Sequence, residues 1–379
     1  MIRRTVPQKS ISKESSLSGV GLHTGENVNL TFKPAPSNTG LIFVREDISG
    51  DNHIEANIKF ISNTDRGTNL DNGKFRIHTS EHVLAALTGL DIDNCYICMD
   101  GAEVPIMDGS SKFFIKAIEE AKIVEQNALR EEFIPSEKIS FKCDETGSII
   151  SILPDDNYKI DTKIDFNTKV LGTQTASIDH ISDFKNEISS ARTFSFLHEL
   201  EMLLEHGLIK GGDLNNAIVY VDKPLADSNM DRLKKAFNKD SISVSANGIL
   251  DNLSLHYPNE AARHKLLDVI GDLALIGMKI RGKVIAEKPG HAVNAKFAQM
   301  VSEVIKVDRK NVLPKIDFAK KPLMDSNQIM NVIPHRPPFL LIDEVLELSE
   351  SHVIGLRRVE KTECSCRRYY IFKITYILN

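Results

Sequence analysis

The predicted secondary structure runs through the same order twice: strands, a helix, a strand and a second helix. The first run is expected within residues 1–126 and the second within 127–308, with a polar stretch around 125–137 between them. The helices of the second run are expected at about 259–277 and 292–306. The duplication concerns architecture, since no convincing residue-level repeat accompanies it. Two successive units of mixed helices and strands therefore account for most of the chain.

Composition and charge exclude several classes of protein. The 379 residues are 41% hydrophobic and 26% charged, with a net charge of -5, so a nucleic-acid-binding protein is not expected. No stretch approaches the roughly 18 apolar residues of a membrane span, and the N-terminus lacks the apolar segment of a signal peptide. Five cysteines, an odd number, favour a reducing compartment and hence a cytoplasmic protein. Cys95 and Cys98 fall in a predicted strand, where a structural role is expected.

The predicted helix around RHKLLDVIGD, residues 263–272, carries polar groups on one face. His264, Asp268 and Asp272 follow at four-residue spacing, whereas the aliphatic residues between them mark another face. This stripe is either a solvated surface or a site. The two side chains of an HxxxD pair lie about 6 Å apart, and zinc accepts both His nitrogen and carboxylate oxygen. His264 and Asp268 are therefore candidate ligands, although the spacing alone is a weak signal.

A third ligand and a base are predicted at the start of another helix, in TSEHVLAAL, residues 79–87. Adjacent helical residues point about 100° apart. If His82 binds a metal, Glu81 can therefore face a water beside it and act as general base. The alternative is that Glu81 only complements the helix dipole, which leaves His82 unexplained.

Further residues suit the hydrolysis of an amide. His291 follows Gly290 at a predicted helix start and can project from a fixed loop, where Asp272 can hold it as a cation. Thr193, in ARTF, offers a hydroxyl to a developing oxyanion. His23, in GVGLHTGE, lies in a loop from which it can reach a ligand. Each residue is unremarkable alone, and His291 can equally be an ordinary residue at a helix N-terminus.

Seven segments, between about residues 2 and 307, read in order SGVGLHTGE, TSEHVLAALTGLDIDN, EVPIMDGSS, ARTF, GGDLNNAIV, RHKLLDVIGDL and PGHAVNAKF. Together they resemble the UDP-3-O-acyl-N-acetylglucosamine deacetylases of lipid A synthesis. The resemblance implies an α+β fold of two similar domains, 1–126 and 127–308, with helices sandwiched between two sheets and one zinc ion between the domains.

The resemblance also implies a role for each residue singled out above. The implied zinc ligands are His82, His264 and Asp268, and the implied general base is Glu81. His291 would be the cation that stabilises the oxyanion, and Asp272 would orient it. Thr193 would offer its hydroxyl to the oxyanion, and Lys265 would contact the substrate. Such a site would hydrolyse the N-acetyl amide of UDP-3-O-(3-hydroxyacyl)-N-acetylglucosamine to the free amine and acetate, the committed step of lipid A synthesis. A transient association with the inner membrane is compatible with this substrate.

An insertion at about 193–222 matches the segment that forms the family's apolar passage for the acyl chain. Phe194, Phe196, Leu200 and Leu204 suit such a passage, although ordinary packing within the insertion explains them equally well. Phe194 is therefore expected to contact substrate, as are Lys265 and His23.

The segment MDSNQIMNVIPHRPPFLLIDEVLEL, residues 324–348, resembles the start of the 3-hydroxyacyl-[acyl carrier protein] dehydratases, which have a hot-dog fold. After a linker at 309–322, residues 323–379 are thus expected to be an incomplete hot-dog-type segment. The catalytic motifs of that family are missing, and His335 matches a non-catalytic position. From about residue 360 the tail resembles neither family, and a frameshift or premature end is expected. Acyl carrier protein would be a partner only of a complete module.

The sequence therefore predicts a zinc-dependent deacetylase fused to the beginning of a dehydratase. Two alternatives stay open. The chain could act as a 3-hydroxyacyl-[acyl-carrier-protein] dehydratase through its second module, or it could be a non-catalytic binder of acyl sugar nucleotides with a structural metal.

Overall fold

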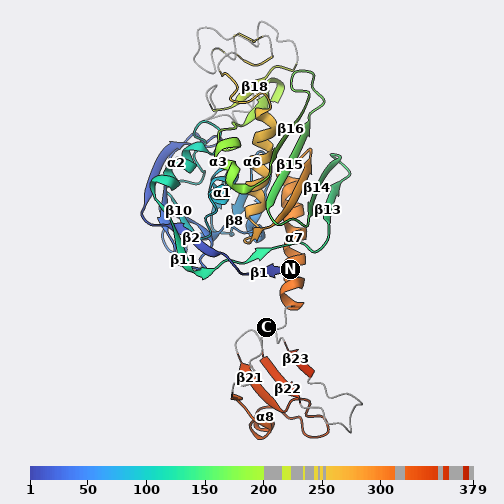
Figure 1. Ribbon diagram of the computed structural model, residues 1–379. Coiled ribbons are helices and arrows are strands. Elements are labelled where there is room, and N and C mark those ends of the chain that lie inside the picture. Colours follow the sequence, from blue (N-terminus) through green and yellow to red (C-terminus); the bar gives the residue numbers. More distant parts are fainter. Residues whose placement is uncertain are drawn as a thin grey trace. The chain divides into compact units, whose positions relative to one another are not determined.

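The computed structural model describes residues 1–199, 216–222, 234, 243–245, 248–250, 253–311, 321–348, 353–357 and 370–374. The chain divides into two compact units, Met1–Asp308 and Arg309–Asn379. Runs of strands are separated by helices along the first unit, and several separate sheets form (Figure 1), which confirms the expected α+β class.

The first large sheet has five strands: β3 (Ser15–Val20), β4 (Asn27–Pro34), β5 (Leu41–Arg45), β6 (His53–Glu55) and β10 (Cys95–Met99). Their order is β3-β4-β10-β5-β6, and the last strand in sequence, β10, pairs antiparallel with β4 and parallel with β5. Helix α1 (Glu81–Gly89) precedes β10, and α2 (Lys112–Glu120) follows it. Cys95 and Cys98 are buried in β10, and burial raises the pKa of Cys95 to about 12, which fits the expected structural role.

The second large sheet repeats this plan with β13 (Ile139–Cys143), β14 (Ser148–Leu153), β15 (Tyr158–Asp165), β16 (Thr173–Ile178) and β20 (Gly282–Glu287). Its order is β13-β14-β20-β15-β16, and again the last strand, β20, pairs antiparallel with β14 and parallel with β15. Helix α6 (Glu260–Ala274) precedes β20, and α7 (His291–Asn311) follows it. The duplicated order seen in the sequence is thus a duplicated topology.

Helices α1 and α6 lie between the two large sheets (Figure 1). All side chains of α1 are buried, as are those of α6 except Arg263, Lys265 and Ala274. A Cβ atom at Gly271 of α6 would stand 2.1 Å from the backbone oxygen of Glu81, so the two helices approach each other closely at this glycine. One continuous apolar core joins both halves of the first unit, from Phe32 and Leu84 to Leu266 and Phe297. The close contact of α1 with α6 places side chains from both halves of the sequence at the centre of this core.

Smaller sheets and turns connect the two halves. Three strands, β1 (Ile2–Arg3), β12 (Glu132–Phe133) and β19 (Lys279–Ile280), form one sheet, and β2 (Pro7–Ile11) pairs with β11 (Ile123–Leu129). A hairpin sheet of β7 (Ile61–Asn63), β8 (Asn69–Asp71) and β9 (Arg76–Ile77) leads into α1, and β17 (Phe194–Phe196) pairs with β18 (Ile218–Tyr220). The remaining elements are η1 (Ile58–Phe60), η2 (Ile181–Asp183) and α3 (Phe184–Glu187).

The second unit has a short helix, α8 (Ser326–Val332), and an antiparallel sheet of β21 (Glu344–Leu348), β22 (Val353–Arg357) and β23 (Tyr370–Ile374). Asp325 caps α8 in a capping box with Gln328. A small separate core contains Leu346, Ile354 and Leu356. The region expected to be aberrant from about 360 contributes β23, and its other residues lie outside the described part of the chain.

Candidate metal centre

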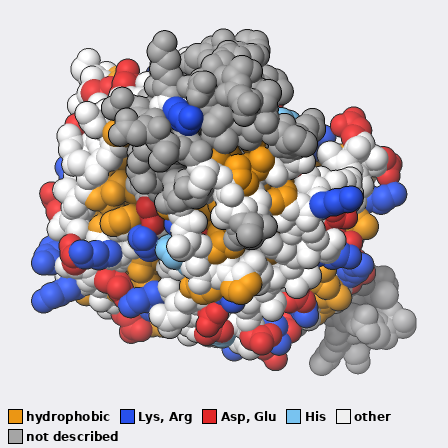
Figure 2. All heavy atoms as spheres, turned by 90° about the horizontal axis from the view of Figure 1, so that it is seen from above, with side chains coloured by type: hydrophobic (Ala, Val, Ile, Leu, Met, Phe, Trp, Pro, Cys, Tyr) orange, Lys and Arg blue, Asp and Glu red, His pale blue; other side chains and the backbone are white. Residues whose placement is uncertain are grey.

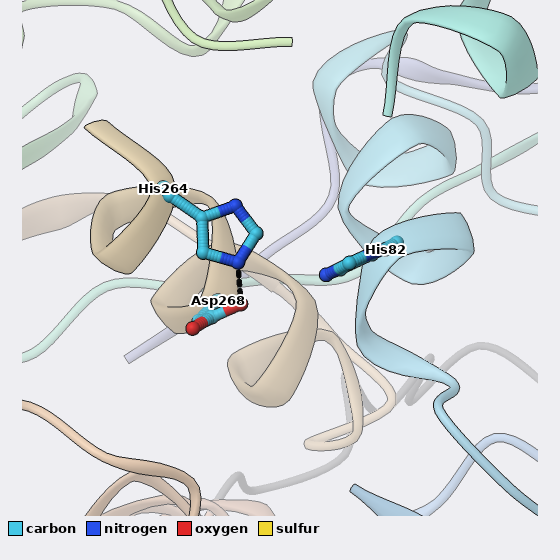
Figure 3. Close-up of side chains that lie close together, drawn as sticks. All are labelled: His82, His264 and Asp268. Carbon is cyan, nitrogen blue, oxygen red and sulfur yellow. Dashed lines mark ion pairs between the residues drawn. The ribbon is translucent and has the colours of Figure 1, made fainter. Parts of the chain in front are cut away.

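Three potential metal ligands converge where α1 meets α6. His82 comes from the first turn of α1, and His264 and Asp268 occupy successive turns of α6 (Figure 3). One ligand atom from each residue lies within 4.8 Å of the other two, and all three residues are at most 3% exposed. The HxxxD stripe is therefore an interior group, and the solvated-surface alternative is wrong.

The two histidines of this cluster are held in the neutral form. Burial lowers the pKa of His82 to about 3 and also lowers the pKa of His264. The Nδ1 of His264 lies 3.1 Å from the carbonyl oxygen of Ala191, to which it can donate, and this leaves the Nε2 lone pair free. Nε2 lies 3.4 Å from Oδ1 of Asp268 (dashed in Figure 3), but a neutral imidazole forms no ion pair there.

Asp268 supplies the charged member of the group. Burial opposes ionisation of its carboxyl, but the positive charges around it, Lys265 first, outweigh burial and hold its pKa well below the usual range. Lys265 Nζ donates to Oδ2 at 2.8 Å, whereas Oδ1 is buried without a hydrogen-bond partner among the described residues. A buried carboxylate oxygen without a donor, beside two neutral imidazoles, is the donor set that a divalent zinc ion accepts. The residues fit the group that the sequence predicts.

Glu81 stands next to His82 but outside the ligand cluster. Its Oε2 accepts the backbone N–H of Thr68 at 2.9 Å, and its Oε1 lies 3.9 Å from Nε2 of His291. Burial raises the pKa of the Glu81 carboxyl to about 7, although the nearby His291 charge opposes the shift. A carboxyl with this pKa can exchange a proton near neutral pH.

His291, the first residue of α7, is paired with α6. Its Nδ1 lies 3.0 Å from Oδ2 of Asp272, and its Nε2 lies 3.9 Å from Oδ2 of Asp268. Burial disfavours the imidazolium, but the charges of Asp272 and Asp268 outweigh burial and raise the pKa of His291 to about 9. The ring is therefore cationic at neutral pH, with Nε2 directed toward the acidic side chains.

Of the residues predicted to contact the substrate, only some lie beside the ligand cluster. Lys265 Nζ lies 5.6 Å from the centre of the Phe194 ring, and that ring stands 6.4 Å from the His264 ring. Thr193 precedes Phe194, and its backbone N–H donates to Gly109. His23 is tied to Glu103 through its backbone N–H, and none of the described contacts joins its ring to the ligand cluster.

The sequence reasoning missed several buried polar residues that hydrogen-bond to residues of the site or to segments beside them. They are Thr68, Glu103, Asn294 and the buried pair Arg192–Glu260. Asn294 lies one helical turn after His291 and donates to Asp272, so its spacing was a usable signal. Glu260 likewise lies one turn before His264. Thr68 and Glu103 lie outside helices, where no periodicity marks them.

The family model described as UDP-3-O-acyl N-acetylglycosamine deacetylase matches residues 8–239 and 228–303 of this chain. These ranges contain every residue of the ligand cluster together with Glu81 and His291. The chain belongs to the UDP-3-O-acyl N-acetylglycosamine deacetylase family.

Individual relatives agree with this membership of the deacetylase family. The "Bifunctional enzyme LpxC/FabZ" of Bacteroides thetaiotaomicron is 40% identical over 94% of this chain and 77% of that relative. The protein of the same name from Porphyromonas gingivalis is 42% identical over the same shares. The "UDP-3-O-acyl-N-acetylglucosamine deacetylase" of Myxococcus xanthus is 38% identical over 78% of this chain and 86% of that relative. The alignments with the two bifunctional relatives extend beyond the first unit, which supports a deacetylase joined to a FabZ-like part.

Within the described part of this family member, no helix is both long and apolar enough to cross a membrane.

Proposed function

We propose that this protein is a zinc-dependent deacetylase that hydrolyses the N-acetyl amide of UDP-3-O-(3-hydroxyacyl)-N-acetylglucosamine, releasing acetate and the free amine in lipid A synthesis. The observation that carries the proposal is the convergence of His82, His264 and Asp268 beside a carboxyl with a pKa of about 7 and a cationic imidazole. Family membership supports deacetylation, and the free buried cysteines suit a reducing cytoplasm.

His82, His264 and Asp268 would hold the zinc ion. Zinc bound by three protein ligands lowers the pKa of a coordinated water from about 15.7 toward about 7 and polarises an amide carbonyl. The chain's contribution is to keep both imidazoles neutral and Asp268 ionised, so that the donor set is ready without further deprotonation.

Glu81 and His291 divide the proton transfers between them. The carboxylate of Glu81, with its Oε2 held by Thr68, removes a proton from the attacking water as the carbonyl carbon is attacked. The imidazolium of His291, held by Asp272 through Nδ1, stabilises the negative charge that develops on the carbonyl oxygen, together with the Thr193 hydroxyl. The C–N bond then breaks, and the amine takes up one proton from Glu81 or His291. Both groups have pKa values that permit this exchange near neutral pH.

The acyl chain would lie along aromatic side chains beside the metal centre. The Phe194 ring meets the rings of Phe166, Phe196 and Tyr220 edge-on, with ring centres 5.5–6.2 Å apart. Figure 2 shows hydrophobic side chains reaching the surface on the face that carries β18. Lys265 and His23 would contact the polar part of the substrate. The expected passage residues Leu200 and Leu204 lie outside the described residues.

We further propose that the deacetylase consists of two domains, 1–126 and 127–308, and that residues after a linker at 309–322 are a dehydratase-like segment without dehydratase activity. The repeated sheet topology and the separate small core of the second unit support this division. The bifunctional names of two relatives support the origin of the segment.

Metal removal and restoration test the proposed function. Chelation should abolish acetate release from the UDP-linked substrate, and one equivalent of Zn²⁺ should restore it. A non-catalytic binder with a structural metal predicts no acetate release by the metal-loaded protein. Thioester hydration assays with a crotonyl substrate distinguish the dehydratase alternative, which predicts activity that survives chelation.

A further inference from the structure

We propose that Thr68 is a positioning residue of the deacetylation site, whose hydroxyl orients Asp272 while its backbone N–H orients Glu81. Thr68 lies in the turn between β7 and β8 and is 1% exposed. Neither its residue type nor its place in the sequence suggests a role in amide hydrolysis. The role rests on the proposed function, because orienting these two groups matters only if they transfer protons and stabilise charge.

The hydroxyl of Thr68 fixes the carboxylate plane of Asp272. Its Oγ1 donates to Oδ1 of Asp272 at 2.5 Å, across 204 residues of sequence. The other oxygen, Oδ2, faces Nδ1 of His291 at 3.0 Å and accepts from Asn294 at 2.8 Å. With one oxygen occupied by Thr68, the carboxylate cannot rotate without breaking a buried hydrogen bond, so Oδ2 stays directed at the imidazole.

The backbone of Thr68 fixes the general base. Its N–H donates to Oε2 of Glu81 at 2.9 Å, and its carbonyl accepts the backbone N–H of Ser80 at 3.1 Å and the Ser80 hydroxyl at 2.8 Å. The preceding Gly67 has φ +157, and a Cβ there would stand 3.0 Å from Oε1 of Glu81. The turn is therefore hydrogen-bonded to the start of α1, and its backbone packs closely against the Glu81 carboxylate.

One residue thus determines the spacing between the base and the cation. Nε2 of His291 lies 3.9 Å from Oε1 of Glu81. Thr68 contacts both groups, because its N–H donates to Oε2 of Glu81 and its Oγ1 lies 3.3 Å from Nδ1 of His291. Partners that hold active-site groups in this way typically contribute about 10- to 100-fold to activity. Because the substrate would not touch Thr68, loss of its hydroxyl should lower kcat and leave KM unchanged.

Three single variants of the full chain, loaded with Zn²⁺, test the hydroxyl. Thr68→Val keeps the shape and the backbone N–H but removes the donor to Asp272, and should lower kcat about 10- to 100-fold at unchanged KM and metal content. Thr68→Ser keeps the hydroxyl and should retain most of the activity. Thr162→Val is the matched control, because Thr162 is 2% exposed and its hydroxyl has no partner among the described residues. Equal kcat for Thr68→Val and the parent would overturn the proposal.

A double-mutant cycle on the metal-free protein tests the same hydrogen bond without substrate. Thr68→Val and Asp272→Ala are combined, and urea unfolding is measured for the parent, both single variants and the double variant. The Thr68 change should destabilise the parent but have little further effect in the Asp272→Ala background. Additive effects would overturn the proposed coupling, and if Asp272→Ala fails to fold, the contrast between serine and valine at position 68 decides. An inactive parent protein would refute the proposed function and leave this cycle unaffected, so the two failures are distinguishable.

Discussion

Glu81 and His82 are adjacent in the sequence but serve different chemistry because α1 turns them toward different neighbours. His82 faces His264, with ring centres 5.1 Å apart, whereas the Glu81 carboxylate faces Thr68 and His291. Burial disfavours the charged form of both groups and therefore shifts their pKa values in opposite directions: it lowers the pKa of the His82 imidazole to about 3 and raises the pKa of the Glu81 carboxyl to about 7. One helical turn thus carries both a proposed metal ligand and the proposed general base.

The pKa values of Glu81 and His291 predict a bell-shaped dependence of kcat/KM on pH. Glu81 must be ionised, so the rate rises as pH increases through a value near 7, and His291 must be protonated, so the rate falls as pH increases through a value near 9. A divalent cation nearby favours the carboxylate and the neutral imidazole, so metal loading moves both limbs to lower pH. The measurement is acetate release between about pH 5 and 10.

Two histidine variants serve as a matched pair for this profile. His291→Gln should remove the alkaline limb and lower the rate at every pH, because the cation that stabilises the oxyanion is lost. His180→Gln changes an exposed histidine at the N-cap of η2 and should keep both limbs. An alkaline limb that persists unchanged in His291→Gln would contradict the assignment.

The elements could be predicted from the sequence better than the contacts between them. The helix with His264 and Asp268 was predicted because its polar stripe and aliphatic face follow the helical period, and α6 has that stripe. The choice between a solvated stripe and a site required the structure, because α6 is covered by α1 and by β15 and β16 of the second sheet. Ser80 occupies the N-cap position of α1, yet its hydroxyl makes no capping hydrogen bond and donates to the backbone carbonyl of Thr68. No local sequence pattern indicates that Thr68, in a turn before α1, donates a hydrogen bond to the carboxylate of Asp272, 204 residues later.

The crossing of α1 with α6 is predicted to depend on Gly271. Gly271→Ala would place a methyl group 2.1 Å from the Glu81 carbonyl oxygen, so the helices must separate and the ligands must move apart. Overpacking of this kind costs about 1–3 kcal/mol in the free energy of unfolding. We expect a lower unfolding midpoint and a lower zinc content after dialysis, measured by elemental analysis.

Gly290→Ala is the control for this substitution, because a Cβ at Gly290 meets no atom within 4 Å although it neighbours the site. It should leave both the unfolding midpoint and the zinc content near those of the parent. Normal zinc content in Gly271→Ala would show that the helix spacing does not determine the ligand geometry.

At the scale of the whole molecule, the repeated topology explains why the site needs both halves of the first unit. In each half, the central strand of the sheet pairs with one antiparallel and one parallel neighbour; this strand is β10 in the first sheet and β20 in the second. A helix precedes each of these strands in the sequence. Those two helices meet between the sheets: α1 contributes one of the three proposed ligands and α6 contributes the other two. Neither repeat alone contains a complete donor set, which couples metal binding to the association of the two halves.

The second unit is predicted to be dispensable for deacetylation. All members of the ligand cluster, and Glu81, His291 and Thr68, lie within the first unit, which has its own continuous core. A chain that ends after Asn311 keeps α7 complete and should match the full chain in kcat and KM within about twofold, as expected for independent parts. A chain that ends after Gly277 is the control: it lacks β20, the central strand of the second sheet, and His291, and should neither fold nor release acetate. Loss of acetate release in the Asn311 truncation, with its unfolding midpoint preserved, would show that residues beyond 311 take part in catalysis.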